Sequence, residues 1–338
     1  MDNNGTIEIE MTAVVLGAND TLIDLDMPYG YRLVREKLKG SCLENEVLQR
    51  DDTVNVQYYA SNLGTSEDPE FVFIHKKQIM EVGLEFFSID KMLTGNTETY
   101  IYFDELTSQW NRELFNLLTM LRLSQEGNIE IADKRYSIVA QYKCNKVKSN
   151  SVVSLDTPIS VYDDLYQWNG DGSETFEMMK SLPPGIITEF QDVFSRFESG
   201  YSISRIEDAY KDLITLAEII LIGYNSRDQK GDKKIKLSNR IAAAISDDAS
   251  ADLLKDKIRQ IYKERSDETH EGDAQNINAE ELKLLRGYIR KLIVNCLTYC
   301  NDNYESFSDK SFRGMKKEYV QQLLSRVEDL KSKGLLTT

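Results

Sequence analysis

The chain has 338 residues, of which 41 are Lys or Arg and 56 are Asp or Glu, so its formal net charge is −15. Hydrophobic residues make up 41% and charged residues 29%, which is typical of a soluble globular protein with room for about two domains. The chain does not open on a basic segment followed by an apolar one. No run approaches 18 apolar residues, so we expect neither a signal peptide nor a membrane span.

The first 150 residues predict an acidic domain of mixed α/β structure. Alternating polar and apolar residues predict strands near residues 6–11 and 54–58, and short runs of β-branched and aromatic residues predict strands at 70–75 and 99–103. A helix is expected from Asp104 to about Leu123, because its apolar residues recur at helical spacing. Two more strands are expected at 129–131 and 136–140.

Residues 151–185 predict a junction between two domains. A serine-rich stretch at 149–154 lies at its start, and it carries Gly170-Asp-Gly172 and ends in Pro183-Pro184-Gly185, which breaks regular structure. Helical periodicity then dominates residues 186–338. The expected helices span residues 203–223, 235–246, 251–269, 278–300 and 312–333. The overall fold class expected is therefore α+β, a mixed domain followed by a helical bundle.

Acidic residues concentrate in the first part of the chain. Residues 1–200 hold 17 Lys or Arg against 33 Asp or Glu, whereas residues 201–300 hold 17 of each. A basic run between Arg227 and Arg240 includes Lys233, Lys234 and Lys236. This run is either a solvated loop and helix face or a rim that contacts the phosphates of RNA.

No pattern in the sequence predicts a metal or a cofactor. The four cysteines (Cys42, Cys144, Cys296 and Cys300) lack the spacing of a zinc site, and a reducing cytoplasm is the simplest compartment for them. The chain has no glycine-rich dinucleotide fingerprint, no phosphate-binding loop and no Gly-x-Ser-x-Gly elbow. Nucleotide hydrolysis and serine hydrolase chemistry therefore have no support.

Arg265 and His270 stand close together before Gly272, near the end of the helix expected at 251–269. Arginine can bind a phosphate with two hydrogen bonds, and histidine can move a proton near neutral pH. The pair therefore suits phosphodiester chemistry that needs no metal. On a regular helix, positions five residues apart lie about 140° apart. The two side chains converge only if the helix ends or bends between them, or if a second subunit presents a matching pair.

Three segments of residues 203–300 carry a family resemblance. They are Leu213-Ile-Thr-Leu-Ala-Glu218, Ile235-Lys-Leu-Ser-Asn-Arg240 and the motif segment Ile261-Tyr-Lys-Glu-Arg265-Ser-Asp-Glu-Thr-His270-Glu-Gly. With them the region resembles the ApeA-like branch of the HEPN family. The resemblance implies a dimerising helical bundle and a metal-independent ribonuclease of bacterial anti-phage or toxin-like function. It further implies that Arg265 and His270 line a cleft shared by two subunits.

The chain departs from the family pattern around the motif. Glu271 separates His270 from Gly272, Ser266 follows Arg265 in place of Asn, His or Asp, and the tyrosine found two residues after the histidine in some members is absent. Some family members only dimerise or bind RNA. The alternative function is therefore a non-catalytic module for dimerisation, RNA binding or protein interaction.

Glu218, Arg240 and Ser266 are the expected supporting residues. Glu218 lies inside an apolar run, where a carboxylate needs a partner. It faces a groove, pairs with Arg240 to stabilise the bundle, or orients Arg265 or His270. Asp267 and Glu268 would raise the pKa of His270 and favour its protonated form. The acidic N-terminal domain would then act as a sensor or as a brake on the RNA site.

Overall fold

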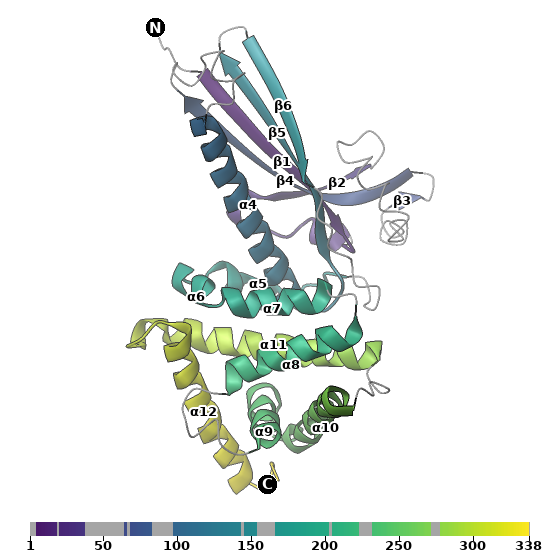
Figure 1. Ribbon diagram of the computed structural model, residues 1–338, viewed down its shortest axis with the longest axis vertical. Coiled ribbons are helices and arrows are strands. Elements are labelled where there is room, and N and C mark those ends of the chain that lie inside the picture. Colours follow the sequence, from purple (N-terminus) through teal and green to yellow (C-terminus); the bar gives the residue numbers. More distant parts are fainter. Residues whose placement is uncertain are drawn as a thin grey trace. The chain divides into compact units, whose positions relative to one another are not determined.

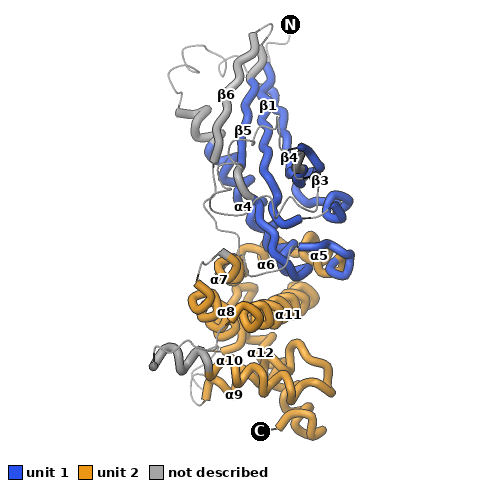
Figure 2. Tube along the Cα trace, turned by 90° about the vertical axis from the view of Figure 1, so that its right-hand side faces the viewer, with its two compact units in different colours: residues 1–159, 164–172 blue, residues 160–163, 173–338 orange. Residues whose placement is uncertain are grey.

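The computed structural model describes residues 5–18, 20–37, 64–65, 68–82, 97–142, 145–153, 166–202, 205–222, 232–271 and 278–337. The chain forms two compact units, residues 1–159 with 164–172 and residues 160–163 with 173–338 (Figure 2). The boundary between them falls inside the segment 151–185, which was expected to be a junction. The first unit has an antiparallel sheet and the second is helical, so the fold class is α+β.

The sheet of the first unit has the strand order β2-β4-β1-β5-β6 (Figure 1), and β3 pairs with β4. All the pairings are antiparallel. The strands are β1 (Gly5–Leu16), β2 (Arg32–Lys37), β3 (Gly64–Thr65), β4 (Asp68–Val82), β5 (Glu130–Tyr142) and β6 (Asn145–Val153). The expected strands at 6–11, 70–75 and 136–140 fall within β1, β4 and β5, and the one at 129–131 overlaps the start of β5 at Glu130. The one at 54–58 lies outside the described residues.

One long helix, α4 (Thr97–Ser124), packs against this sheet. Trp110 of α4 stacks on Tyr136 of β5, with ring centroids 6.2 Å apart. Lys134 and Tyr136 both donate hydrogen bonds to Oδ1 of Asn111, at 2.8 and 3.0 Å. Burial lowers the pKa of Lys134 to about 8.

The expectation of a short strand at 99–103 is wrong, because these residues form the start of α4. The run Tyr100-Ile-Tyr-Phe103 is apolar and aromatic throughout, so it has no period that separates a helix from a strand. It directly precedes a strongly periodic helix, and extending a helix that already exists adds a hydrogen bond for each residue ordered. The serine-rich stretch from 149 also differs from expectation, since it continues the edge strand β6 as far as Val153.

The second unit is built from helices that pack across one another. They are α5 (Ser173–Lys180), α6 (Pro184–Glu189), α7 (Gln191–Ser202), α8 (Ile206–Leu221), α9 (Lys233–Ile245), α10 (Ala251–Glu271), α11 (Ala279–Asn303) and α12 (Phe312–Ser332). Helix α9 contacts α10, α11 and α12, and α8 contacts α7 and α11. Short 3-10 turns occur at Asp20–Leu22, Pro28–Gly30 and Tyr304–Ser306.

The ends of these helices follow the local sequence. The side chain of Asn278 accepts a hydrogen bond of 3.0 Å from the backbone of Glu281, which confirms the expected cap of α11. Gly334, with a φ of 69°, ends α12, and the backbone N–H of Leu335 reaches back to the carbonyl of Leu330 at 2.9 Å. None of the helices in the described ranges combines the length and apolar character needed to cross a bilayer.

Candidate functional site

Both motif residues lie within the single helix α10, which continues past them to Glu271. His270 is therefore in the last turn of α10, as the position of Gly272 indicated. Because one helix carries both positions, regular geometry separates them by about 140° around its axis. The side chains of residues 264–270, including Arg265, Ser266 and His270, lie outside the described part of the structure.

The described residues of α10 show which sides of the helix the two positions occupy. Ile258 and Ile261 are buried, with exposed fractions of 1% and 0%. The position of Arg265 lies within about 40° of both, so it continues the stripe that faces the bundle. The position of His270 lies about 20° from that of the exposed Lys263. Tyr262 occupies the face between the two motif positions, about 60° from one and about 80° from the other.

A carboxylate from another helix meets this intermediate face. The Tyr262 hydroxyl donates a hydrogen bond of 3.0 Å to Oε1 of Glu218 on α8. Nζ of Lys233, at the start of α9, lies 3.9 Å from Oε2 of the same carboxylate. The Glu218 side chain is 18% exposed and the Lys233 side chain is 51% exposed, so the cluster is open to solvent on the lysine side. Glu218 thus links α8, α9 and α10 one turn before Arg265.

Arg240 lies deeper in the bundle. Its residue is 4% exposed, and its guanidinium donates a hydrogen bond to the backbone carbonyl of Leu221 in the last turn of α8. Lys316 of α12 donates to the neighbouring carbonyl of Ile222 at 2.6 Å. Helix α8 therefore ends against two cations, which complement the negative end of its dipole and bind its unpaired carbonyls. This position suits Arg240 to holding the bundle together rather than to contacting phosphate.

The three candidate RNA-binding lysines, Lys233, Lys234 and Lys236, lie in the first turn of α9. Asp232 caps this turn, since its side chain accepts hydrogen bonds from the backbone of Lys234 at 2.8 Å and of Ile235 at 3.4 Å. Cations at a helix N-terminus oppose the helix dipole and so do not stabilise the helix. The three lysines are at least partly exposed, so this end of α9 presents positive charge at the surface of the helical unit.

Sequence reasoning did not single out Tyr262 or Lys316 as part of this region. Tyr262 gave one signal, because its hydroxyl, three residues before Arg265 on a helix that packs in a bundle, needs a hydrogen-bond partner. Nothing in the sequence around Lys316 indicated its contact, because the carbonyl that it binds belongs to Ile222, 94 residues away in the chain. Across the residues that the structure describes, no group of three His, Cys, Asp or Glu side chains is arranged to hold a metal ion.

Comparison of the chain with protein-family models, with curated proteins and with solved structures finds no match.

Proposed function

We propose that the chain is a metal-independent endoribonuclease of the HEPN type, whose helical unit is a HEPN-like bundle. Arg265 binds the scissile phosphate and stabilises the charge that the transition state gains. His270 transfers a proton. The lysines at the start of α9 contact neighbouring phosphates of the RNA. The chain is a bacterial protein with an anti-phage or toxin-like role in the cytoplasm, as its resemblance to the family implies.

The proposed reaction uses the RNA's own nucleophile. Solvent water takes the proton of the 2′-hydroxyl, whose oxygen attacks the adjacent phosphorus while the bond from phosphorus to the 5′-oxygen breaks. Protonated His270 gives its proton to the departing 5′-oxygen. The products are a 2′,3′-cyclic phosphate and a 5′-hydroxyl, and no oxidant, metal or cofactor takes part.

The observation that carries the proposal is the hydrogen bond between Tyr262 and Glu218 on the face of α10 between the two motif positions. Together with the hydrogen bond of 3.1 Å from the Tyr210 hydroxyl of α8 to the carbonyl of Ile261, it joins α10 to α8, and Lys233 brings a cation to the same place. A helix held in this way presents an arginine on one side and a histidine on the other. A second copy of the chain would complete the cleft, so the active form is a homodimer through the helical unit.

The acidic N-terminal part has a separate role in this proposal. Residues 1–200 carry an excess of 16 negative charges. Such a field repels RNA, or mimics it and covers the cleft, over a distance of about one Debye length, roughly 8 Å at physiological salt. The acidic N-terminal part is therefore a sensor or a brake.

The second candidate function is a non-catalytic module for dimerisation, RNA binding or protein interaction. One observation favours it, namely that the position of Arg265 continues the buried stripe of Ile258 and Ile261. An arginine on that stripe would bind bundle carboxylates or carbonyls rather than RNA. Glu271 and Ser266, which depart from the family pattern, point the same way.

The reaction type is tested by the ends of the products. The full chain is incubated in EDTA with a labelled RNA, and with the same RNA carrying a 2′-deoxy group at the main cleavage position. We expect fragments with a 2′,3′-cyclic phosphate and a 5′-hydroxyl, and no cleavage at the substituted position. Fragments with a 3′-hydroxyl and a 5′-phosphate, or an RNA that stays intact, would contradict the nuclease proposal.

A further inference from the structure

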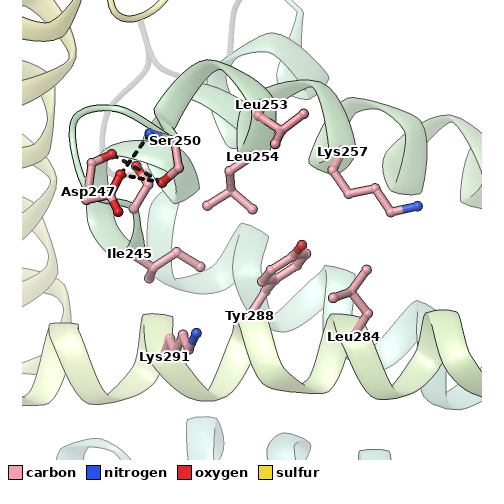
Figure 3. Close-up of a pocket in the computed structure, with 10 residues that line it drawn as sticks. Ile245, Asp247, Ser250, Leu253, Leu254, Lys257, Leu284, Tyr288 and Lys291 are labelled. Carbon is pink, nitrogen blue, oxygen red and sulfur yellow. Dashed lines mark hydrogen bonds between the residues drawn. The ribbon is translucent and has the colours of Figure 1, made fainter.

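A pocket of about 540 Å³ lies in the helical unit between the start of α10 and the middle of α11 (Figure 3). This volume is in the range of small-molecule sites, roughly 300–1,000 Å³. Leu253, Leu254, Leu284 and Tyr288 are among the residues that line it, together with Ile245 at the end of α9. The pocket therefore combines the volume of a small-molecule site with several apolar side chains in its lining.

Exposed apolar side chains concentrate at this pocket. Leu253 is 77% exposed and Leu284 is 38% exposed, and they are two of the five large hydrophobic residues that are exposed in the described ranges. Leu253 is the most exposed of the five. Water contact with these side chains is unfavourable, and a bound apolar group would relieve it.

Charged side chains mark the two ends of the pocket. Lys257 of α10 and Lys291 of α11 line it at opposite ends (Figure 3). Neither makes an ion pair or hydrogen bond within the described part of the chain. Asp247 lies at the end opposite Lys257, and its carboxylate accepts hydrogen bonds of 2.8 and 2.7 Å from the backbone and hydroxyl of Ser250. An anion is therefore favoured at the Lys257 end.

Tyr288 supplies a donor near that end. Its hydroxyl points into the space between α10 and α11, between Leu254 and Lys257 (Figure 3). This hydroxyl has no hydrogen-bond partner among the described residues, and burial raises the pKa of Tyr288 above its usual value. The hydroxyl therefore stays protonated and can donate to an acceptor.

We infer that this pocket binds a small organic carboxylate with an elongated apolar body. The carboxylate accepts hydrogen bonds from the Lys257 ammonium and the Tyr288 hydroxyl, and the body covers Leu253, Leu254 and Ile245. The inference rests on residues other than the motif of α10 and is independent of the proposed nuclease activity.

The test uses octanoate as the probe, titrated into the full chain and followed by ligand-observed NMR and calorimetry. Octanoate should bind at a single site, and octylamine, with the same chain and the opposite charge, should not. Lys257→Gln should weaken octanoate binding about fivefold to tenfold, because it removes one partly exposed ion pair and its hydrogen bond. Tyr288→Phe and Leu253→Ser should each weaken it, since they remove the donor and part of the apolar surface.

Lys291→Gln is the matched control, because it removes a lysine from the same pocket at the end where Asp247 lies. We expect less than a twofold effect on octanoate binding. Far-UV circular dichroism and thermal unfolding show whether each variant keeps its fold. Three outcomes would overturn the inference: octanoate does not bind, octylamine binds equally well, or Lys257→Gln in a folded chain weakens binding no more than Lys291→Gln does.

Discussion

The hydroxyl of Tyr262 donates a hydrogen bond of 3.0 Å to the carboxylate of Glu218 and so joins α10 to α8. The two residues are 44 positions apart in the sequence. Three residues after Tyr262, α10 carries Arg265, and His270 follows in the last turn before the helix ends at Glu271. The rotation of α10 about its axis, which decides where the two motif residues point, is therefore set next to the motif itself.

Tyr262→Phe removes this hydrogen bond and keeps the ring. We expect the free energy of unfolding to fall by about 1 kcal/mol, as for other single hydrogen bonds. RNA cleavage should fall about tenfold, because α10 then loses one of the two hydrogen bonds, from Tyr262 and from Tyr210, that join it to α8 beside the motif. Tyr319→Phe is the matched control, since it removes a hydroxyl that donates to Asn295 at 2.8 Å on α11. A control variant whose cleavage rate falls as far as that of Tyr262→Phe would refute a specific role for the Tyr262 hydrogen bond.

The lysines at the start of α9 should contribute to RNA affinity by neutralising phosphates. Replacing Lys233 and Lys234 by Gln should weaken binding to RNAs of different sequence equally. It should also reduce the slope of log affinity against log salt by about 0.7 for each phosphate of a single strand that is no longer neutralised. Fluorescence anisotropy over a salt series measures both effects. The control replaces Arg313 and Lys317, two exposed residues of α12, by Gln and so removes the same charge elsewhere. It should change neither the affinity for RNA nor the salt slope. If the control lowers both as much as the α9 variant does, only the net charge of the chain matters.

Asp252 should make the stability of the helical unit depend on pH in the acidic range. Its Oδ1 accepts hydrogen bonds from Nζ of Lys255 at 2.5 Å and from the backbone and hydroxyl of Thr337, both at 2.8 Å. These hydrogen bonds, that of Lys255 first, lower the pKa of Asp252 to about 2. A carboxyl group with a lowered pKa stabilises the folded state above its unfolded pKa of about 3.9, and the effect is lost as the pH falls towards the folded value.

Asp252→Asn should therefore lower stability near neutral pH by about 1 kcal/mol, because it removes hydrogen bonds to a charged acceptor that is 39% exposed and so partly screened by solvent. It should also flatten the dependence of the unfolding temperature on pH between about 4 and 2. Thermal unfolding followed by circular dichroism across this range measures both. A variant whose acid dependence matches that of the unchanged chain would show that Asp252 does not carry the effect.

The homodimer is a prediction about assembly. Arg265 and His270 lie about 140° apart around α10, so a composite cleft needs a second copy, and two-fold dimers are the commonest oligomers. Light scattering at micromolar concentration should give a mass of twice 38.8 kDa. A mass of 38.8 kDa throughout the concentration range would rule out a composite site.

What could be predicted from sequence was local. Asn278, Gly334 and the spacing of apolar residues indicated where helices begin and end, because capping and periodicity depend on neighbours a few positions away. The prediction of a strand at 99–103 was wrong because an apolar aromatic segment has no period that distinguishes a helix from a strand. The strand order β2-β4-β1-β5-β6 could not be predicted either, since it depends on pairing between distant segments, such as Val15 with Val72.

In the candidate site, too, local features could be predicted from the sequence and contacts between distant residues could not. The R-x4-H motif and the lysines near 235 were visible in the sequence, and the carboxylate of Glu218 was expected to need a partner. Its contacts with Tyr262 and Lys233, and that of Arg240 with the carbonyl of Leu221, join residues that are far apart in the chain. Periodicity shows that such side chains face inward, but only the packing of the helices decides which of them meet.

The most direct measurement is the rate of RNA cleavage by purified His270→Ala in EDTA, beside the unchanged chain and Arg313→Ala as the control. We predict that the unchanged chain and the control cleave equally, and that His270→Ala is slower by about two to four orders of magnitude while its helical content and unfolding temperature stay the same. A folded His270→Ala variant that cleaves RNA at the unchanged rate would contradict the nuclease proposal.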